Sequence, residues 1–256
     1  MSQTRNILVL TAGGDYAWVI VNALASHLDG VEVALEQPES KTVFLKRRAR
    51  RIGWVQTAGQ FGTMVISRVG KRLAGARARA IIAASGAQTG MPDHLPVTPV
   101  SSANAGDCLE LIAARKPDIV LLVGCRMLSR ATLAAIPCPV LNYHSGINPK
   151  YRGVAGGWWA RATGDCGNYG TTVHLVDAGV DTGDILHQAF LAPDPRDTLL
   201  TDSLAMAAGS REMVVRAVED ALSGNLETRP GPLPSVQRFH PPLWTYLATG
   251  LTRGIW

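Results

Sequence analysis

Short apolar runs alternate with amphipathic segments along most of this chain. The apolar runs predict strands near residues 5–11, 31–35, 119–123, 139–144, 170–176 and 184–188. Apolar residues at three- and four-residue spacing predict helices near 16–28, 105–115, 129–135, 155–163 and 198–223. Strands that alternate with helices are typical of βαβ units. We therefore expect an α/β fold with a mostly parallel, twisted sheet and helices on both of its faces.

Residues 41–80 depart from this alternation. A dense basic run comes first, comprising Lys46, Arg47, Arg48, Arg50 and Arg51. Apolar residues at helical spacing follow, namely Phe61, Met64, Val65, Val69 and Leu73, with Arg68, Lys71 and Arg72 on other faces. This pattern predicts a basic helical insertion whose apolar face packs on the body of the protein.

Residues 225–256 also change character, since they contain five prolines and four large aromatic residues. Proline cannot continue a helix, so the pattern predicts an extended tail packed on the body rather than a long helix. Alternatively, the tail contributes to a substrate pocket or to a dimer contact. We accordingly expect a catalytic domain over residues 1–224, with its insertion at 41–80, and a C-terminal extension over 225–256.

Composition narrows the class of protein. Of the 256 residues 46% are hydrophobic and 18% charged, which favours a buried core over disorder. We find neither an apolar run as long as the roughly 18 residues of a membrane span nor a signal-type leader. The four cysteines are scattered without a Cys-x-x-Cys pair. These features predict a reduced, cytoplasmic protein without structural zinc.

Charge is distributed unevenly. Eleven of the 25 Lys and Arg residues, and none of the 20 acidic ones, fall within residues 41–92, so the rest of the chain is net acidic. A basic insertion on an acidic body indicates a local anionic partner, not general nucleic-acid binding. Three interpretations of the segment stay open: a solvated structural insertion, a surface that recruits an anionic substrate, and a peripheral contact with an anionic membrane.

Polar residues with complementary chemistry lie at the end of the fourth predicted strand and after the fifth. Asn142 and His144 lie two apart on an extended segment, so their side chains point to the same side. Asp181 follows in a Gly-rich loop. An amide can donate to an oxyanion, a histidine can move a proton near neutral pH, and a carboxylate can orient the histidine. Each residue alone has an ordinary explanation as a strand-end or turn residue.

The joint order of these residues resembles the folate-dependent formyltransferase family. The chain reads Asn142-x-His144, then Pro149-x-x-Arg152-Gly153, then Thr172-x-His174 and Asp181-x-Gly183. The resemblance runs from about residue 118 to about residue 188. It implies a Rossmann-like formyltransferase fold and an enzyme that moves a formyl group from 10-formyltetrahydrofolate to a primary amine, without a metal.

The resemblance also implies roles for individual residues. Asn142, His144 and Asp181 are expected to be catalytic. The expected folate-binding residues are Arg126, Met127, Leu128, Val176, Asp177 and Val180, and the expected substrate-binding residues are Ser145, Gly146 and Arg152. Arg126 on the surface, without folate contact, is an equal alternative. His174 lies within an apolar strand-like run and is expected to be structural.

The acceptor amine is narrowed by departures from the family pattern. Thr11-Ala12-Gly13-Gly14-Asp15 has an acid where glycinamide ribonucleotide enzymes carry a phosphate loop. Only about 32 residues follow Gly224, which disfavours the methionyl-tRNA enzymes with their C-terminal barrel. We therefore expect a small-molecule acceptor, an amino sugar or a nucleotide-linked amino sugar, and no nucleic acid. A glycinamide ribonucleotide formyltransferase-like enzyme, a membrane-associated binding protein of the same fold and a folate deformylase are the alternatives. A homodimer is an open possibility.

Overall fold

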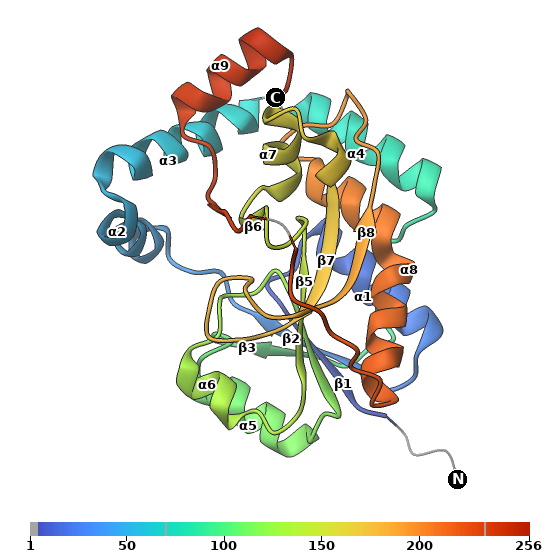
Figure 1. The fold of residues 1–256 in the computed structure, drawn as a ribbon. Coiled ribbons are helices and arrows are strands. Elements are labelled where there is room, and N and C mark those ends of the chain that lie inside the picture. Colours follow the sequence, from blue (N-terminus) through green and yellow to red (C-terminus); the bar gives the residue numbers. More distant parts are fainter. Residues whose placement is uncertain (1–4, 70, 233) are drawn as a thin grey trace.

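A seven-stranded sheet forms the centre of the protein (Figure 1), in the order β3-β2-β1-β4-β5-β7-β8. The computed structural model describes residues 5–69, 71–232 and 234–256. The strands are β1 (Ile7–Thr11), β2 (Val31–Glu36), β3 (Val97–Val100), β4 (Ile119–Val123), β5 (Val140–His144), β7 (Gly170–Leu175) and β8 (Ile185–Phe190). Neighbours from β3 to β5 pair in parallel, whereas β7 and β8 are antiparallel. The expected α/β fold with a mostly parallel sheet is confirmed.

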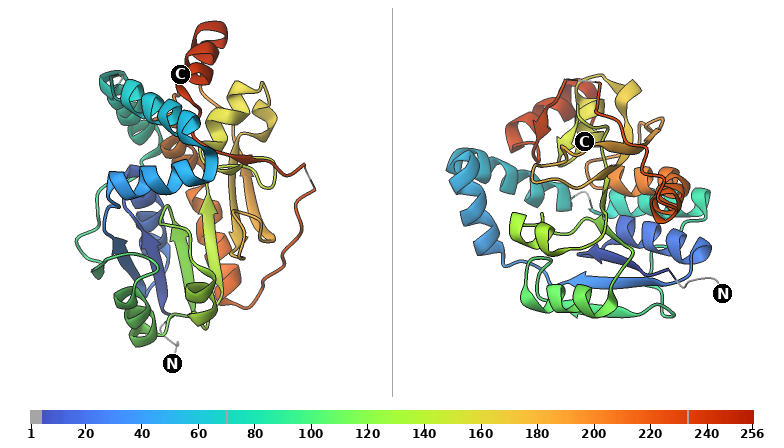
Figure 2. Two further views of the ribbon diagram at one scale, coloured as in Figure 1. Left: turned by 90° about the vertical axis from the view of Figure 1, so that its left-hand side faces the viewer. Right: turned by 60° about the horizontal axis from the view of Figure 1, so that its bottom comes forward.

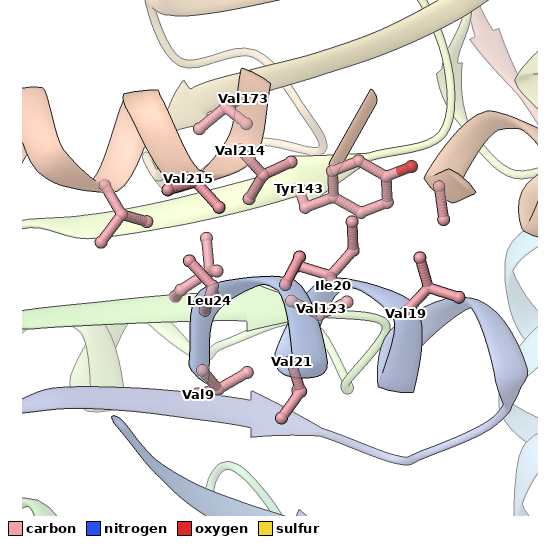
Figure 3. Close-up of a cluster of buried hydrophobic side chains, with 14 of the residues drawn as sticks. Val9, Val19, Ile20, Val21, Leu24, Val123, Tyr143, Val173, Val214 and Val215 are labelled. Atoms are coloured by element: carbon pink, nitrogen blue, oxygen red, sulfur yellow. The ribbon is translucent and has the colours of Figure 1, made fainter. Parts of the chain in front are cut away.

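Helices cover both faces of the sheet, so the body has three layers. One face packs against α1 (Asp15–His27), α8 (Asp202–Leu222) and the C-terminal half of α4 (Lys71–Ser85). Figure 3 shows this core, where Ile20 and Leu24 of α1 meet Val214 and Val215 of α8. The other face packs against α5 (Gly106–Arg115) and α6 (Arg130–Ala135).

Strand β3 has no counterpart among the predicted strands. Its sequence, Val97-Thr98-Pro99-Val100, is short and contains a proline. Proline removes one ladder donor, which is tolerated where a strand has only one neighbour. Because β3 occupies the edge of the sheet and pairs only with β2, Pro99 fits there.

The basic insertion forms helices, as expected, but its packing differs from the prediction. It contains α2 (Lys41–Ile52), α3 (Trp54–Val69) and α4. Phe61 and Val65 were expected on the packed face, yet they are 44% and 47% exposed, while Thr63 is fully buried. The expected burial of Phe61 and Val65 is therefore wrong. The side chains of Arg68, Val69, Lys71, Arg72 and Leu73 lie outside the described part of the chain.

The C-terminal extension begins as an extended segment and ends as a helix. A two-residue strand β9 (Gln237–Arg238) pairs in parallel with β6 (Arg152–Gly153). Directly after Pro241 and Pro242 the chain forms α9 (Leu243–Arg253), which packs on α3 (Figures 1 and 2). The prediction of an extended tail is thus wrong for the last part. Proline immediately before a helix costs no hydrogen bond, since the first N–H groups have no partner within the helix.

Candidate active site

The last residues of β5 place two polar side chains at the carboxyl edge of the sheet. Asn142 and His144 lie two residues apart on this strand, and His144 is its last residue and almost fully buried. Strand β5 stands between parallel β4 and antiparallel β7, and its register pairs Asn142 with His174 of β7. In open α/β sheets ligands bind at the carboxyl ends of the strands, so this edge is where a site is expected.

The loop between β7 and β8 carries Asp181 to the same place. Asp181 has a left-handed backbone with φ of 48°, a conformation that a non-glycine residue rarely adopts. Asp177 closes the loop by accepting hydrogen bonds from Gly179 N at 3.0 Å and Thr182 Oγ1 at 2.7 Å. Arg152 Nη1 donates to Val180 O at 2.6 Å, which ties the loop to the segment after β5. The strained residue is therefore held by contacts on both sides.

These elements bring the three predicted catalytic residues into one polar cluster. Asn142 Nδ2 donates to Asp181 Oδ1 at 3.0 Å, and His144 Nδ1 lies 3.6 Å from Asp181 Oδ2. Gly153 N also donates to Asp181 Oδ2, at 2.8 Å. The carboxylate is thus the common partner of an amide, an imidazole and a backbone N–H.

The hydrogen bonds assign the protons on the two histidines. A carbonyl oxygen only accepts, so His144 Nε2, 2.7 Å from Tyr151 O, carries a proton. By the same argument His174 Nδ1, 2.7 Å from Leu175 O, carries one. His174 Nε2 then accepts from Asn142 Nδ2 at 3.1 Å. The amide of Asn142 therefore uses both of its N–H groups within the cluster.

The cluster keeps Asp181 in its charged form. Burial alone would raise the pKa of this carboxyl, but the adjacent His144 and His174, which carry a positive charge when both ring nitrogens are protonated, and the Gly153 N–H hold it well below its usual range. Charged partners and donated hydrogen bonds both favour a carboxylate over the neutral acid. The site thus presents a fixed negative charge beside two imidazoles.

His174 is the member of the cluster that the sequence did not identify. It is buried in β7, as a structural histidine would be, but its Nε2 lies 3.4 Å from Asp181 Oδ1 as well as beside Asn142. Only the register of β5 against β7 shows this, since residues opposite one another on neighbouring strands share a face. The Thr-x-His spacing was the one signal in the sequence.

Arg126, expected at the folate site or on the surface, makes a buried ion pair. Its Nη1 donates to Glu36 Oε1 at 2.9 Å, and its Nη2 donates to Gln37 O at 2.7 Å. Glu36 is almost fully buried at the end of β2. The guanidinium therefore connects the ends of β2 and β4, and a contact with folate stays a prediction.

The other expected folate residues lie on two loops. Met127 is exposed and Leu128 is buried after β4. Val176 directly follows β7, and its N–H donates to Val140 O at 2.8 Å. Asp177 and Val180 use their oxygens to hold the loop that carries Asp181.

The expected substrate residues lie directly after His144. Gly146 approaches His144 so closely that an added Cβ would lie 2.5 Å from Nε2, so a larger residue would displace the imidazole. Ser145 precedes it and is half-buried. Arg152 uses its guanidinium on Val180 O and on Ser235 Oγ at 2.8 Å. Their contact with a substrate stays a prediction.

Within residues 5–69, 71–232 and 234–256, no group of three or more His, Cys, Asp or Glu residues is placed to hold a metal ion. The donors of the cluster are instead satisfied by one another. What the arrangement offers is an amide donor, two imidazoles and a carboxylate at the edge of a sheet.

Comparison with known proteins agrees with this geometry. The family model described as formyl transferase matches residues 5–218, which is most of the chain and includes every residue of the cluster. The chain belongs to the formyl transferase family.

The similar proteins have names that specify different acceptors of the formyl group. Methionyl-tRNA formyltransferase from Desulfotalea psychrophila is 37% identical over 114 residues, covering 43% of this chain and 35% of that protein. A sugar N-formyltransferase from a Shewanella species has a TM-score of 0.58 at 12% identity, covering 92% of this chain and 77% of that one. Glycinamide ribonucleotide transformylase 1 from Symbiobacterium toebii has a TM-score of 0.57 at 20% identity, covering 90% and 95%.

The extent of these matches limits what they establish. The chain spans only about a third of the curated relative from Desulfotalea psychrophila, and the two solved structures share the fold at low identity. The comparisons therefore establish family and fold, whereas the acceptor must be argued from the site.

Proposed function

We propose that this protein is an N-formyltransferase that moves a formyl group from 10-formyltetrahydrofolate to the primary amine of an amino sugar. The observation that supports this proposal most directly is the convergence of Asn142, His144 and Asp181. Asn142 Nδ2 lies 3.0 Å and His144 Nδ1 lies 3.6 Å from the Asp181 carboxylate. Membership of the formyl transferase family supports folate as the formyl donor.

The reaction makes one C–N bond and breaks another. The amine nitrogen attacks the formyl carbon, negative charge develops on the formyl oxygen, and the bond to folate N10 breaks. The amine loses one proton and N10 gains one, so atoms and electrons balance without an oxidant. The protein has to stabilise the oxyanion and carry that proton.

Asn142 is the proposed oxyanion donor. Both of its N–H groups are used inside the cluster, on Asp181 and on His174. We expect the substrate oxygen to replace His174 as acceptor, because the bond to the charged carboxylate is the stronger one and keeps the amide in place. Loss of one oxyanion donor typically costs about a hundredfold or more in rate.

His144 and Asp181 are the proposed route for the proton. The Nε2 of His144 is fixed by Tyr151 O, which leaves Nδ1 facing the charged carboxylate. A protonated His144 would present its Nδ1–H to Asp181, so the pair can hold a proton between attack and departure of N10. His174 orients Asn142 and is proposed as a positioning residue.

The amino-sugar acceptor is favoured over glycinamide ribonucleotide by the start of α1. Asp15 opens this helix and is exposed there. A helix N-terminus ordinarily favours a phosphate, and an acid at that position repels one. Complementation of a purine auxotroph tests the alternative, and growth on the gene for this protein would favour glycinamide ribonucleotide.

The function is tested with the purified protein, 10-formyltetrahydrofolate and a panel of free and nucleotide-linked amino sugars. Addition of one formyl group, detected by mass, is the expected result for at least one amino sugar. His144→Ala and Asn142→Ala should remove that product. Transfer to none of the sugars, with transfer to another amine, would overturn the acceptor and keep the reaction.

The loops after β4 and β7 are the proposed folate site. Pterin rings need a flat apolar slot with a few fixed polar groups, and Leu128 with the backbone of residues 126–128 and 176–181 supplies those types. Calorimetry with a folate analogue should show binding that Leu128→Asp weakens. Equal affinity of wild type and variant would contradict this placement.

A further inference from the structure

The outward face of helix α3 is apolar. Trp54, Ala58, Phe61 and Val65 recur at the spacing of one helical face, and all four are exposed, Trp54 by 66%. Four polar residues of the helix, Thr57, Gln60, Thr63 and Ser67, are buried instead. A surface helix of a globular protein normally has the opposite arrangement.

The inverted orientation is held by hydrogen bonds of the inward residues. Thr63 Oγ1 donates to Pro241 O at 2.8 Å, outside the helix. Gln60 accepts a hydrogen bond from the Arg48 guanidinium. Because these buried polar groups have partners, rotating the helix to hide its apolar face would break satisfied bonds.

Helix α9 extends the same apolar surface. The ring of Trp244 lies over Gly59 of α3, where an added Cβ would be only 2.5 Å from it, and yet half of Trp244 is exposed. Further along α9, Leu251 is 79% exposed. Figures 1 and 2 show the two helices side by side at one end of the molecule. We name this surface the α3/α9 face and define it by Trp54, Ala58, Phe61, Val65, Trp244 and Leu251.

Cationic side chains border this face. Helix α2 directly precedes α3 and exposes Lys46, Arg47, Arg50 and Arg51. Arg47 pairs with Glu39 at 2.8 Å, whereas Lys46, Arg50 and Arg51 form no ion pair with an acid among the described residues. No acidic residue occurs anywhere in residues 41–92. The apolar face is thus flanked by positive charge that nothing in this segment neutralises.

We propose that the α3/α9 face docks on the surface of an anionic lipid bilayer, with α2 against the headgroups. Exposed Trp, Phe and Leu beside Lys and Arg are the composition of helices that lie in a membrane interface. Acidic lipids attract such basic segments. Among the described residues no helix is long and apolar enough to cross the bilayer, so the contact is peripheral.

Other occupants fit this face less well. A second copy bound about a two-fold axis would present the same surface, and residues 41–92 and 239–256 contain no acid to pair with the cations of α2. A polynucleotide would satisfy the cations of α2 but would leave the apolar residues of α3 and α9 without a partner. An anionic lipid surface can both pair with the cations of α2 and cover the apolar residues of α3 and α9.

Docking would also hold the candidate site near the membrane. The Arg51 guanidinium lies 5.8 Å from the ring centre of Phe239, and the adjacent Arg238 pairs with Gly153. Gly153 N donates to Asp181. The docking surface and the catalytic carboxylate are therefore connected through one short strand of the C-terminal extension.

The test is co-sedimentation of the whole protein with vesicles of phosphatidylcholine alone or with about a third phosphatidylglycerol. We expect binding to the anionic vesicles, weakened by raising the salt concentration, because screening shortens the reach of surface charge. Trp54→Gln with Phe61→Gln should lower the partition coefficient by about tenfold or more, as expected for loss of two partly buried aromatic side chains. Both residues are exposed, so the variant should fold, and its thermal melt verifies this.

Matched controls separate the contribution of this face from general stickiness. Phe190→Gln replaces an exposed aromatic residue on β8 and should leave vesicle binding unchanged. Lys46→Gln with Arg50→Gln should reduce binding, and Arg216→Gln on α8 should not. Binding to heparin without binding to vesicles would overturn the lipid proposal in favour of a polyanion. Dimerisation that Trp54→Gln abolishes, without vesicle binding, would overturn it in favour of a second copy.

Discussion

The carboxylate of Asp181 has a depressed pKa because the gains from His144, His174 and the Gly153 N–H outweigh the cost of burial. A depressed pKa contributes stability above the ordinary carboxyl value near 4, and this stability is lost as the pH falls below it. We expect Asp181→Asn to lower the free energy of unfolding at pH 7 and to differ less from wild type at pH 3. Urea unfolding at a series of pH values measures this.

The same substitution should remove catalysis. Asparagine keeps the size of the side chain but lacks the charge that orients His144, so we expect formyl transfer to fall by about a hundredfold or more. Asp177→Asn, a change in the same loop, is the control for loop geometry. If Asp181→Asn retained the wild-type kcat/KM, the proposed role of Asp181 in the reaction would be wrong.

Asp202 shows the opposite net pKa shift, because burial outweighs its favourable partner. Burial raises its pKa to about 7, with Arg161 lowering it and Asp197 raising it further. A raised pKa stabilises the fold fully below the ordinary value near 4, and that contribution is lost as the pH rises through about 7. We expect wild type to lose stability relative to Asp202→Asn between pH 4 and pH 7. Exposed Asp29→Asn is the matched control, and a constant difference across that range would contradict the shift.

At the scale of elements, the sequence predicted the helices and strands whose own pattern of apolar residues shows which sides are buried. Strands β1 and β4 are almost entirely apolar because helices cover both of their sides, and α1 and α8 carry regular apolar stripes. Asn142, His144 and Asp181 were predicted because their joint order resembles the formyltransferase pattern and because they lie near or after the ends of predicted strands.

What the sequence did not predict depends on contacts between distant segments. The buried face of α3 is polar because it packs on Pro241 and α9. These partners lie almost 180 residues further along the chain, so the sequence around α3 does not reveal them. His174 joins the cluster through the β5–β7 register, and β3 is recognisable only as the edge next to β2. No local periodicity carries that information.

The ion pair between Arg126 and Glu36 is expected to matter for stability. Removing one partner of a buried pair leaves an uncompensated charge and typically costs about 3–5 kcal/mol. We expect Arg126→Met to lower the free energy of unfolding by an amount of that order, and Arg130→Met on exposed α6 to change it little. The double variant Arg126→Met with Glu36→Leu should recover part of the loss.

A conservative change at the same position separates structure from folate binding. If Arg126 contacts folate, Arg126→Lys should weaken binding of a folate analogue beyond its effect on stability. An unchanged dissociation constant with a lowered melting temperature would assign Arg126 to the frame alone. Calorimetry and a thermal melt on one preparation provide both readings.

At the scale of the whole molecule, the C-terminal extension completes the site rather than the core. Val236 N donates to Pro149 O at 3.0 Å, and Arg152 N and Val154 N donate to Val236 O and Arg238 O at 3.1 and 3.0 Å. These bonds clamp the segment that supplies Gly153 N to Asp181. Every residue of the polar cluster around Asp181 precedes residue 225, yet the segment that holds Gly153 beside Asp181 is hydrogen-bonded to the extension.

This dependence gives a prediction that separates the extension from the core. Val236→Pro removes one clamp donor at a partly exposed position, so the sheet and its three layers should remain folded, with a loss of about 1 kcal/mol for one hydrogen bond. The segment around Gly153 should then shift, and kcat should fall more than the stability does, because small displacements of a catalytic group are costly. Val236→Ala keeps the N–H and should retain near wild-type kcat. Loss of activity in both variants would instead show that the Val236 side chain, and not the clamp, supports the site.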